Sequence, residues 1–119
     1  MGKLHIIQCL SPFQNELVDH ALKIADAALD KGHTVSMFLY MDGVYSMMLS
    51  QDGSPVKMES ISHRVQALIQ KGAQIKTCKL CKILRGIVDD NKPEEIEATG
   101  TGQLDDEFME ADTVLTFTR

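Results

Sequence analysis

Two patterns of hydrophobic positions alternate along the chain. Short apolar runs, typical of buried strands, cover Leu4–Leu10, His33–Tyr40 and Ala73–Thr77. Between them, apolar residues recur every three or four positions, as on one face of a helix, over Gln14–Lys31 and Ser60–Lys71. The alternation predicts successive strand–helix–strand units.

The junctions between these elements support the same interpretation. Gly32 follows the first helix and Gly72 the second, and glycine ends a helix at no steric cost because it tolerates positive φ. A brief strand at Glu97–Thr99, a helix at Gln103–Glu110 and a strand at Thr113–Thr118 complete the pattern. Strands alternating with helices predict an α/β fold, with a mostly parallel sheet covered on both faces.

The stretch after the second strand is less regular and rich in methionine. Its large apolar residues are Met41, Val44, Tyr45, Met47, Met48 and Leu49. An exposed patch of this kind is characteristic of a protein–protein contact, so it predicts the interface of a homo-oligomer. The alternative is a short helix that folds back on its own domain.

Length and composition narrow the class of protein. The 119 residues predict one domain spanning 1–119, and the net charge of -5 with no Trp argues against direct nucleic-acid binding. Three Cys, an odd number, do not make a disulfide framework and favour the reducing cytoplasm. The first nine residues are interrupted by His5 and Gln8, so we expect neither a signal peptide nor a membrane span.

The segment around Cys78 carries the most chemistry. Cys78 stands where the third strand is predicted to end and a helix to begin, and ligands of open parallel sheets gather at that edge. A thiol at a helix start lies near the positive end of the helix dipole, which favours the thiolate. Cys81 follows on the same helix face, within disulfide reach. Four cations accompany them: Lys76, Lys79, Lys82 and Arg85. The set predicts a reactive sulfur nucleophile.

Other interpretations of these cysteines stay open at this point. Buried structural thiols are one, and a thioredoxin-type dithiol is another, although the Trp and Gly-Pro of that motif are absent. A zinc site needs four ligands, which only Cys9 and scattered histidines could complete. Cys9, at the end of the first strand, is expected at the same sheet edge in a structural role. The histidines have no metal-ligand spacing and are expected to be structural or superficial: His5, His20, His33 and His63. No organic or metal cofactor is expected.

Three segments together resemble one known family. Cys78–Ile87 resembles the CxxCxxxRG segment of the DsrE/DsrF-like sulfur-relay proteins, Asp42–Val44 their DGV turn, and Glu110–Phe117 their final EADxVxxF strand. Their order and spacing match, so the resemblance covers nearly the whole chain. It implies a three-layer α/β/α sandwich with a five-stranded sheet, assembled as a homotrimer or hexamer. It also implies that Cys78 matches the sulfur-carrying cysteine.

The expected function is that of a cytoplasmic, sulfurtransferase-like persulfide carrier. Cys78 would take sulfane sulfur from a donor protein and pass it to a thiol of an acceptor protein, and Cys81 could attack the persulfide. One alternative is a CxxC dithiol/disulfide redox protein, and another is a non-catalytic subunit of an oligomer. The sequence leaves open the choice between trimer and hexamer, and whether Cys81 or Cys9 takes part.

Overall fold

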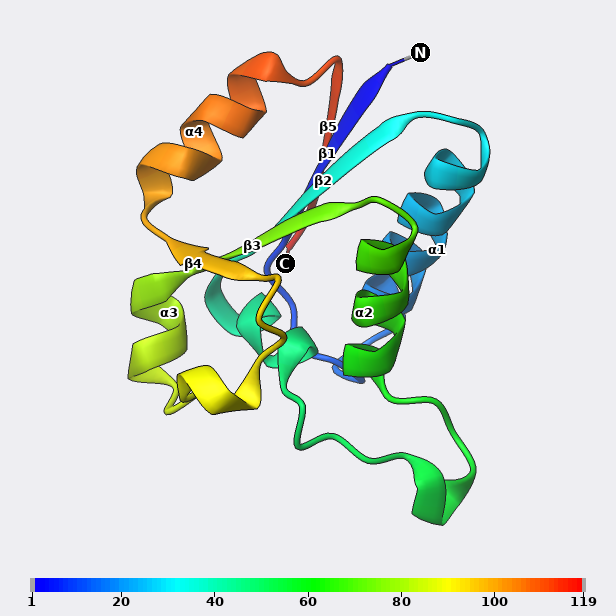
Figure 1. Cartoon of the computed structure of the whole chain (residues 1–119), viewed down its shortest axis with the longest axis vertical. Coiled ribbons are helices and arrows are strands. Elements are labelled where there is room, and N and C mark those ends of the chain that lie inside the picture. Colours follow the sequence, from blue (N-terminus) through cyan, green and yellow to red (C-terminus); the bar gives the residue numbers. More distant parts are fainter. Residues whose placement is uncertain (1, 119) are drawn as a thin grey trace.

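Five parallel strands form a single sheet in the order β4-β3-β2-β1-β5 in the computed structural model, which describes residues 2–118 except the side chains of 103–105 (Figure 1). The strands are β1 (Lys3–Gln8), β2 (Thr34–Leu39), β3 (Gln74–Cys78), β4 (Glu97–Thr99) and β5 (Thr113–Phe117). The helices are α1 (Leu17–Asp30), α2 (Ile61–Gln70), α3 (Lys79–Leu84) and α4 (Thr101–Glu110), and the 3-10 turns are η1 (Met41–Met47), η2 (Ser54–Val56) and η3 (Asp89–Asn91). The α/β class predicted from the sequence is confirmed.

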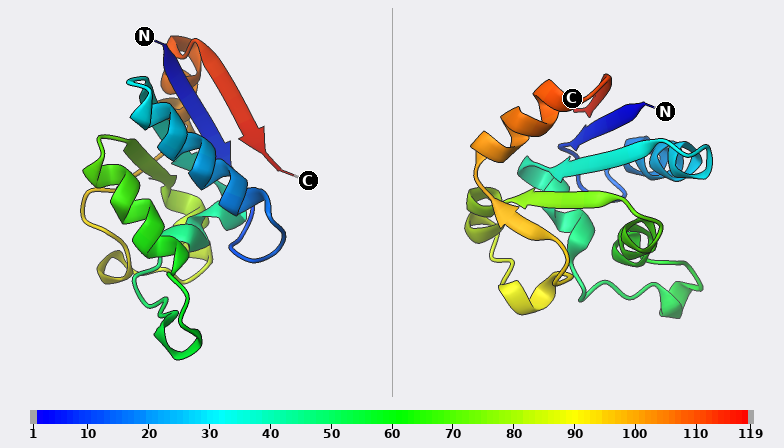
Figure 2. Two further views of the ribbon diagram at one scale, coloured as in Figure 1. Left: turned by 90° about the vertical axis from the view of Figure 1, so that its right-hand side faces the viewer. Right: turned by 45° about the horizontal axis from the view of Figure 1, so that its top comes forward.

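The sheet has helices on both faces. Figures 1 and 2 show α1 and α2 side by side on one face and α4 on the other. The predicted helical spacing supplies the buried face of α1, which consists of Val18, Ala21, Leu22 and Ala25. In the strands, Ile6, Val35 and Phe38 have no exposed surface. Strands whose side chains are buried on both faces are typical of a parallel sheet that lies between two layers of helices. Helix α4 begins at Thr101, two residues earlier than predicted.

Glycine ends three of the helices in the same way. Gly32, Gly72 and Gly86 have φ of 87°, 110° and 75°, in the left-handed region. At the first of these junctions the Gly32 N–H donates to the Leu29 carbonyl, and the next N–H donates to the Ala28 carbonyl, both at 3.0 Å. This closes the helix and turns the chain into the next element. Two of the three junctions were predicted, and the third follows α3.

The methionine-rich stretch differs from the main expectation. Residues Met41–Met47 form η1, which folds back beyond the carboxyl ends of the strands. Val44 and Met47 are fully buried in the core of their own domain, so the prediction that they form an oligomer interface is wrong. Met41 and Leu49 are 45% and 42% exposed. The alternative prediction, a short helix packed on its own domain, is confirmed.

A long loop extends from the globular body between η1 and α2. Figure 1 shows it at the lower right, with η2 at its tip. It carries Val56 and Met58, which are 69% and 55% exposed. Within the described residues, no helix combines the length and apolar character needed to cross a membrane.

Candidate functional site

Cys78 links a strand to a helix. It is the last residue of β3 and the N-cap of α3, with extended backbone angles (φ -71°, ψ 118°). Its Sγ accepts a hydrogen bond from the backbone N–H of Cys81 at 3.2 Å. Sulfur thus occupies the position in which Ser or Asp usually caps a helix. One backbone donor of the helix start is already directed at this thiol.

Both thiols lie below the surface as free cysteines. Cys78 is 4% exposed and Cys81 is 6% exposed. Burial raises the pKa of the Cys81 thiol above its ordinary value, and the hydrogen bond shared with the Cys78 side chain acts in the same direction. The backbone N–H of Met41 and the charge of Arg85 act against them. Cys81 is therefore protonated at neutral pH.

An ion pair joins η1 to α3 beside the cysteines. Arg85 Nε donates to Asp42 Oδ1 at 2.8 Å, and Arg85 Nη1 donates to the Cys81 carbonyl at 3.3 Å. Met41, with a positive φ of 51°, turns the chain so that its N–H meets the Cys81 thiol. The DGV turn and the CxxCxxxRG segment, which are distant in sequence, thus form one structural unit.

Gly43 allows η1 to lie directly on β1. A Cβ at this position would stand 1.9 Å from the Gln8 carbonyl oxygen and 2.8 Å from its carbon. No side chain larger than hydrogen fits such a gap, so the central residue of the DGV turn is required for the close approach.

Two of the predicted lysines pair with carboxylates. Lys76 pairs with Glu107 of α4 at 3.0 Å, and Lys82 pairs with Asp89 at 2.8 Å. The Lys82 side chain is only 7% exposed, whereas that of Asp89 is 84% exposed. Lys79 is exposed. The four positive charges therefore do not all converge on the thiols: Arg85 contacts the Cys81 backbone and its charge acts on the Cys81 thiol, whereas Lys76 and Lys82 each pair with a carboxylate.

Cys9 shares the sheet edge with Cys78, as predicted. In the strand register, Gln8 of β1 pairs with Leu39 of β2, which pairs with Thr77 of β3. Because β2 lies between them and adjacent strands are about 4.8 Å apart, the Cα atoms of Cys9 and Cys78 are roughly 10 Å apart. A disulfide needs less than about 7 Å. Cys9 is half-buried, and burial raises its pKa.

A buried polar cluster on the α4 face of the sheet was not anticipated. His5 has no exposed surface; its Nδ1 shares a hydrogen bond of 2.7 Å with Ser36 Oγ and lies 3.6 Å from Glu107 Oε2. Burial lowers the pKa of His5, and the Glu107 charge only partly offsets this. The spacing of residues in the sequence could not reveal this cluster, because His5, Ser36 and Glu107 come from three separate elements. Among the described residues, no group of three or more His, Cys, Asp or Glu could hold a metal ion.

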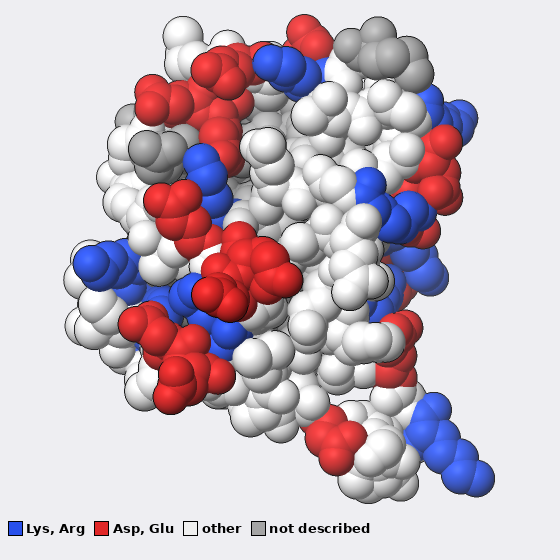
Figure 3. Space-filling model, in the orientation of Figure 1, with Lys and Arg blue, Asp and Glu red and all other residues white. Residues whose placement is uncertain are grey.

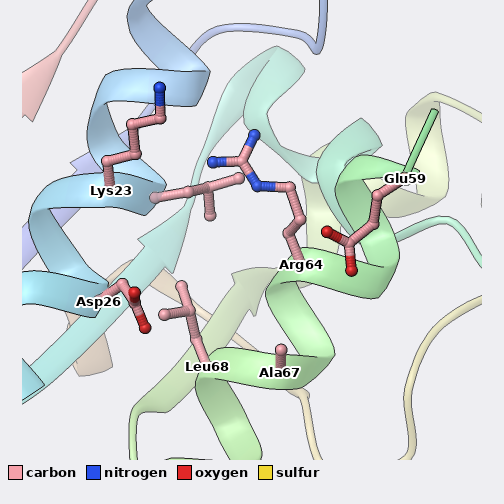
Figure 4. A pocket seen from close by; sticks show the side chains of 7 residues that line it. Lys23, Asp26, Glu59, Arg64, Ala67 and Leu68 are labelled. Carbon is pink, nitrogen blue, oxygen red and sulfur yellow. The ribbon is translucent and has the colours of Figure 1, made fainter. Parts of the chain in front are cut away.

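A cleft of about 190 Å³ lies between α1 and α2 (Figure 4). Lys23 and Asp26 line it from α1, and Arg64 and Glu59 line it from the α2 side. Both cations bind Asp19, Arg64 Nη1 at 2.8 Å and Lys23 Nζ at 3.0 Å. Its lining residues come from α1, α2 and the residues just before α2, so the cleft is separate from the cysteine pair.

Comparison with known proteins places the chain in context. The model of the DsrE/DsrF-like family matches residues 2–117. The crystal structure of the ychN protein from E. coli superposes with a TM-score of 0.88 at 26% identity, covering 98% of this chain and all of that one. "Uncharacterized protein MK0008" of Methanopyrus kandleri is 29% identical over 90% of this chain and 87% of its own length. The Allochromatium vinosum protein named "Putative sulfurtransferase DsrE" is 25% identical, over 89% of this chain and 91% of its own.

Proposed function

The chain belongs to the DsrE/DsrF-like family, and we propose that it carries sulfane sulfur as a persulfide on Cys78 and passes it to a partner thiol in the cytoplasm. The observation that carries this proposal is the hydrogen bond from the Cys81 N–H to the Cys78 sulfur at the carboxyl edge of β3. The name of the Allochromatium vinosum relative, "Putative sulfurtransferase DsrE", supports the reaction class.

The transfer consists of two displacements at sulfur. The Cys78 thiolate attacks the terminal sulfur of a donor persulfide, so that a new S–S bond forms and the donor leaves as a thiolate with the electron pair of the broken bond. An acceptor thiolate then attacks the outer sulfur of Cys78–S–S⁻, and Cys78 leaves as a thiolate. Both steps conserve electrons, so no external oxidant or reductant is consumed.

Cys81 determines how long the persulfide survives. Attack of a Cys81 thiolate on Cys78 Sγ would expel hydrosulfide and close a Cys78–Cys81 disulfide. Because burial and the neighbouring thiol raise the pKa of Cys81, little thiolate is present at neutral pH. The protonated neighbour therefore favours a carrier over a dithiol redox protein.

Intact mass spectrometry after exposure to polysulfide tests the proposal. We expect a gain of about 32 Da in the wild type and in Cys81→Ser, and none in Cys78→Ser. Cys81→Ser should retain the added sulfur longer, since it lacks the resolving thiol. A loss of about 2 Da in the wild type, with no added sulfur in Cys81→Ser, would instead indicate the dithiol redox protein. No mass change would indicate a non-catalytic subunit, and loading of Cys78→Ser but not Cys81→Ser would reverse the roles.

We also propose a homo-oligomer, with an interface that differs from the one predicted from the sequence. Phe13 and Val56 are 70% and 69% exposed, and together with Met58 they line a groove of about 470 Å³ beside the long loop. Apolar side chains this exposed are typical of an interface. Light scattering should give a mass several times 13.2 kDa, reduced by Val56→Ser with Met58→Ser. A mass near 13.2 kDa for the wild type would overturn it.

A further inference from the structure

Arg85 is the C-cap of α3 and lies one helical turn beyond Cys81. Residues four positions apart are neighbours on a helix surface, and Arg85 Nη1 donates to the Cys81 carbonyl at 3.3 Å. Burial and the Cys78 side chain raise the pKa of Cys81, whereas the charge of Arg85 lowers it. Because both thiols are buried, a nearby charge is weakly screened by water. Arg85 is therefore a cation that favours the thiolate of Cys81.

Asp42 of η1 supplies the opposite charge. Its Oδ1 accepts a hydrogen bond from Arg85 Nε at 2.8 Å. This hydrogen bond is the main reason that the pKa of Arg85 is raised, and the charges of Asp42, Cys81 and Tyr45 add to it. The carboxylate, the guanidinium and the Cys81 thiol thus act on one another. Asp42 offsets part of the positive charge that reaches the thiol.

The backbone of η1 fixes Asp42 in this place. On one side of it, Met41 has a left-handed φ of 51° and directs its N–H at the Cys81 thiol. On the other side, Gly43 lies so close to β1 that a Cβ would stand 1.9 Å from the Gln8 carbonyl oxygen. Asp42 is the single residue between these two anchors. The position of its carboxylate therefore follows from backbone contacts and does not depend on a mobile loop.

The lysines of α3 interact with a different carboxylate. Lys82 Nζ binds Asp89 Oδ1 at 2.8 Å, and the charge of Lys79 also acts on Asp89. Figure 3 shows basic and acidic side chains next to one another on the left of the molecule, in the region of α3. The titratable and charged groups that face Cys81 are Cys78 and Arg85 directly, and Asp42 and Tyr45 of η1 through Arg85.

We propose that Asp42 is a positioning residue: by pairing with Arg85 it keeps Cys81 in the thiol form and thereby preserves the sulfur carried by the site. This inference rests on the persulfide function proposed above. The reaction that Asp42 suppresses is the loss of that sulfur as hydrosulfide.

This reaction balances without an external reagent. The Cys81 thiolate attacks Cys78 Sγ, and the bond from Cys78 Sγ to the outer sulfur breaks. The outer sulfur leaves with the electron pair of that bond and takes up the proton that Cys81 released, so the product is hydrosulfide. The outer sulfur is reduced, and the two cysteine sulfurs are oxidised to a disulfide. The protonation state of Cys81 alone decides how fast this happens.

The substitution Asp42→Asn isolates the charge. The amide oxygen still accepts from Arg85 Nε, so the guanidinium stays in place while its charge is no longer offset. With Cys9 and Cys78 replaced by serine, the midpoint of Cys81 alkylation against pH should fall by roughly half a unit to one unit. A thiol one pKa unit more acidic gives about tenfold more thiolate, which is roughly threefold less nucleophilic. Hydrosulfide release should therefore accelerate about two- to threefold.

The decay of the loaded persulfide gives the second measurement. After polysulfide loading and desalting, Asp42→Asn should release hydrosulfide about two- to threefold faster than the wild type, by colorimetric sulfide assay. Intact mass should show the form with about 32 Da added replaced by the form that has lost about 2 Da. In a Cys81→Ser background, Asp42→Asn should leave the decay unchanged. Asp42→Glu, which restores the carboxylate, should restore the wild-type midpoint and decay.

Arg85→Gln carries the same test in a second variant. It removes the cation that favours the thiolate, so the Cys81 midpoint should rise and hydrosulfide release should slow. A merely structural role of the ion pair would loosen α3 in both variants and shift both midpoints in the same direction. Midpoints of Asp42→Asn and Arg85→Gln that move the same way would therefore overturn the inference.

Asp19 provides a matched control. It pairs with Arg64 Nη1 at 2.8 Å between α1 and α2, away from the cysteine pair. Asp19→Asn removes the same charge from the same kind of ion pair and should leave the Cys81 midpoint and the release rate unchanged. An equal shift in Asp19→Asn and Asp42→Asn would assign the effect to net charge and overturn the inference.

The titration of Cys81 separates this inference from the proposed function, because it needs no bound sulfur. A lowered Cys81 midpoint in Asp42→Asn, in a protein that takes up no sulfur from polysulfide, would refute the persulfide carrier and leave the effect of Asp42 on Cys81 intact. Sulfur loading with the same Cys81 midpoint in Asp42→Asn and the wild type would refute the role of Asp42 alone.

Discussion

Replacing Gly43 by alanine is expected to disturb the fold and the site together. The added Cβ would lie 1.9 Å from the Gln8 carbonyl oxygen, whereas ordinary contacts are near ~3.5 Å. Because the obstructing atoms belong to the backbone of a central strand, η1 must move by roughly 1.5 Å. That shift displaces Val44 and Met47 from the core and Asp42 from Arg85.

The size of the effect follows from these contacts. Overpacking of this kind costs about 1–3 kcal/mol, and the partly exposed ion pair adds less than about 1 kcal/mol. The unfolding entropy of a 119-residue domain is roughly 0.25 kcal/mol per degree. A loss of about 3 kcal/mol therefore lowers Tm by roughly 12 °C.

Calorimetry of Gly43→Ala against a matched glycine variant tests the reasoning. Gly102 lies in α4, and no described atom outside its own helix lies within 4 Å of the place that an added methyl group would take. Gly102→Ala should therefore leave Tm unchanged or raise it slightly. Gly43→Ala should also alkylate faster at Cys81, because Met41 and Asp42 move away from it. A Tm within about 2 °C of the wild type would refute the close approach of η1 to β1.

Three further expectations concern pH, the second thiol and a helix end. The free energy of unfolding should fall as pH drops below about 6.5, because buried His5 binds its proton less readily than in the unfolded chain. In urea unfolding, His5→Gln should make the free energy of unfolding depend less steeply on pH. Equal pH dependence in the variant and the wild type would contradict this expectation. With Cys78 and Cys9 replaced by Ser, alkylation of Cys81 should have its midpoint above about 8.5, and a lower midpoint would disprove the burial argument. Gly86→Ala should cost about 1–2 kcal/mol in urea unfolding through its positive φ alone; an unchanged midpoint would count against that conformation.

Much of the fold could be predicted because its signals are local. The period of the apolar positions distinguishes strand from helix, and the conformation at Gly32 and Gly72 depends on the few residues around each. The position of Cys78 could be predicted for the same reason, since it depends only on the end of one strand and the start of one helix. The position of Cys81 near Cys78 could be predicted because the two residues are three positions apart on a helix.

The remainder depends on which distant segments meet. Nothing in the local sequence assigns Arg85 to Asp42 or buries His5 beside Ser36, because each pair lies more than thirty residues apart. A run of lysines likewise does not reveal which carboxylates will face it. Met47 was misplaced because methionine suits an exposed contact as well as an irregular space in the core.

The strand order also has a consequence during synthesis on the ribosome. Strand β5 pairs with β1, and the Lys3 N–H reaches the Asp112 carboxylate at 2.8 Å across 109 positions. At about 5–20 residues per second, translation needs roughly 5–20 s between these two points. Throughout that interval one edge of β1 has unpaired N–H and C=O groups, which can pair with another nascent chain. The emerging polypeptide is thus exposed to edge-to-edge aggregation until its last strand has left the ribosome.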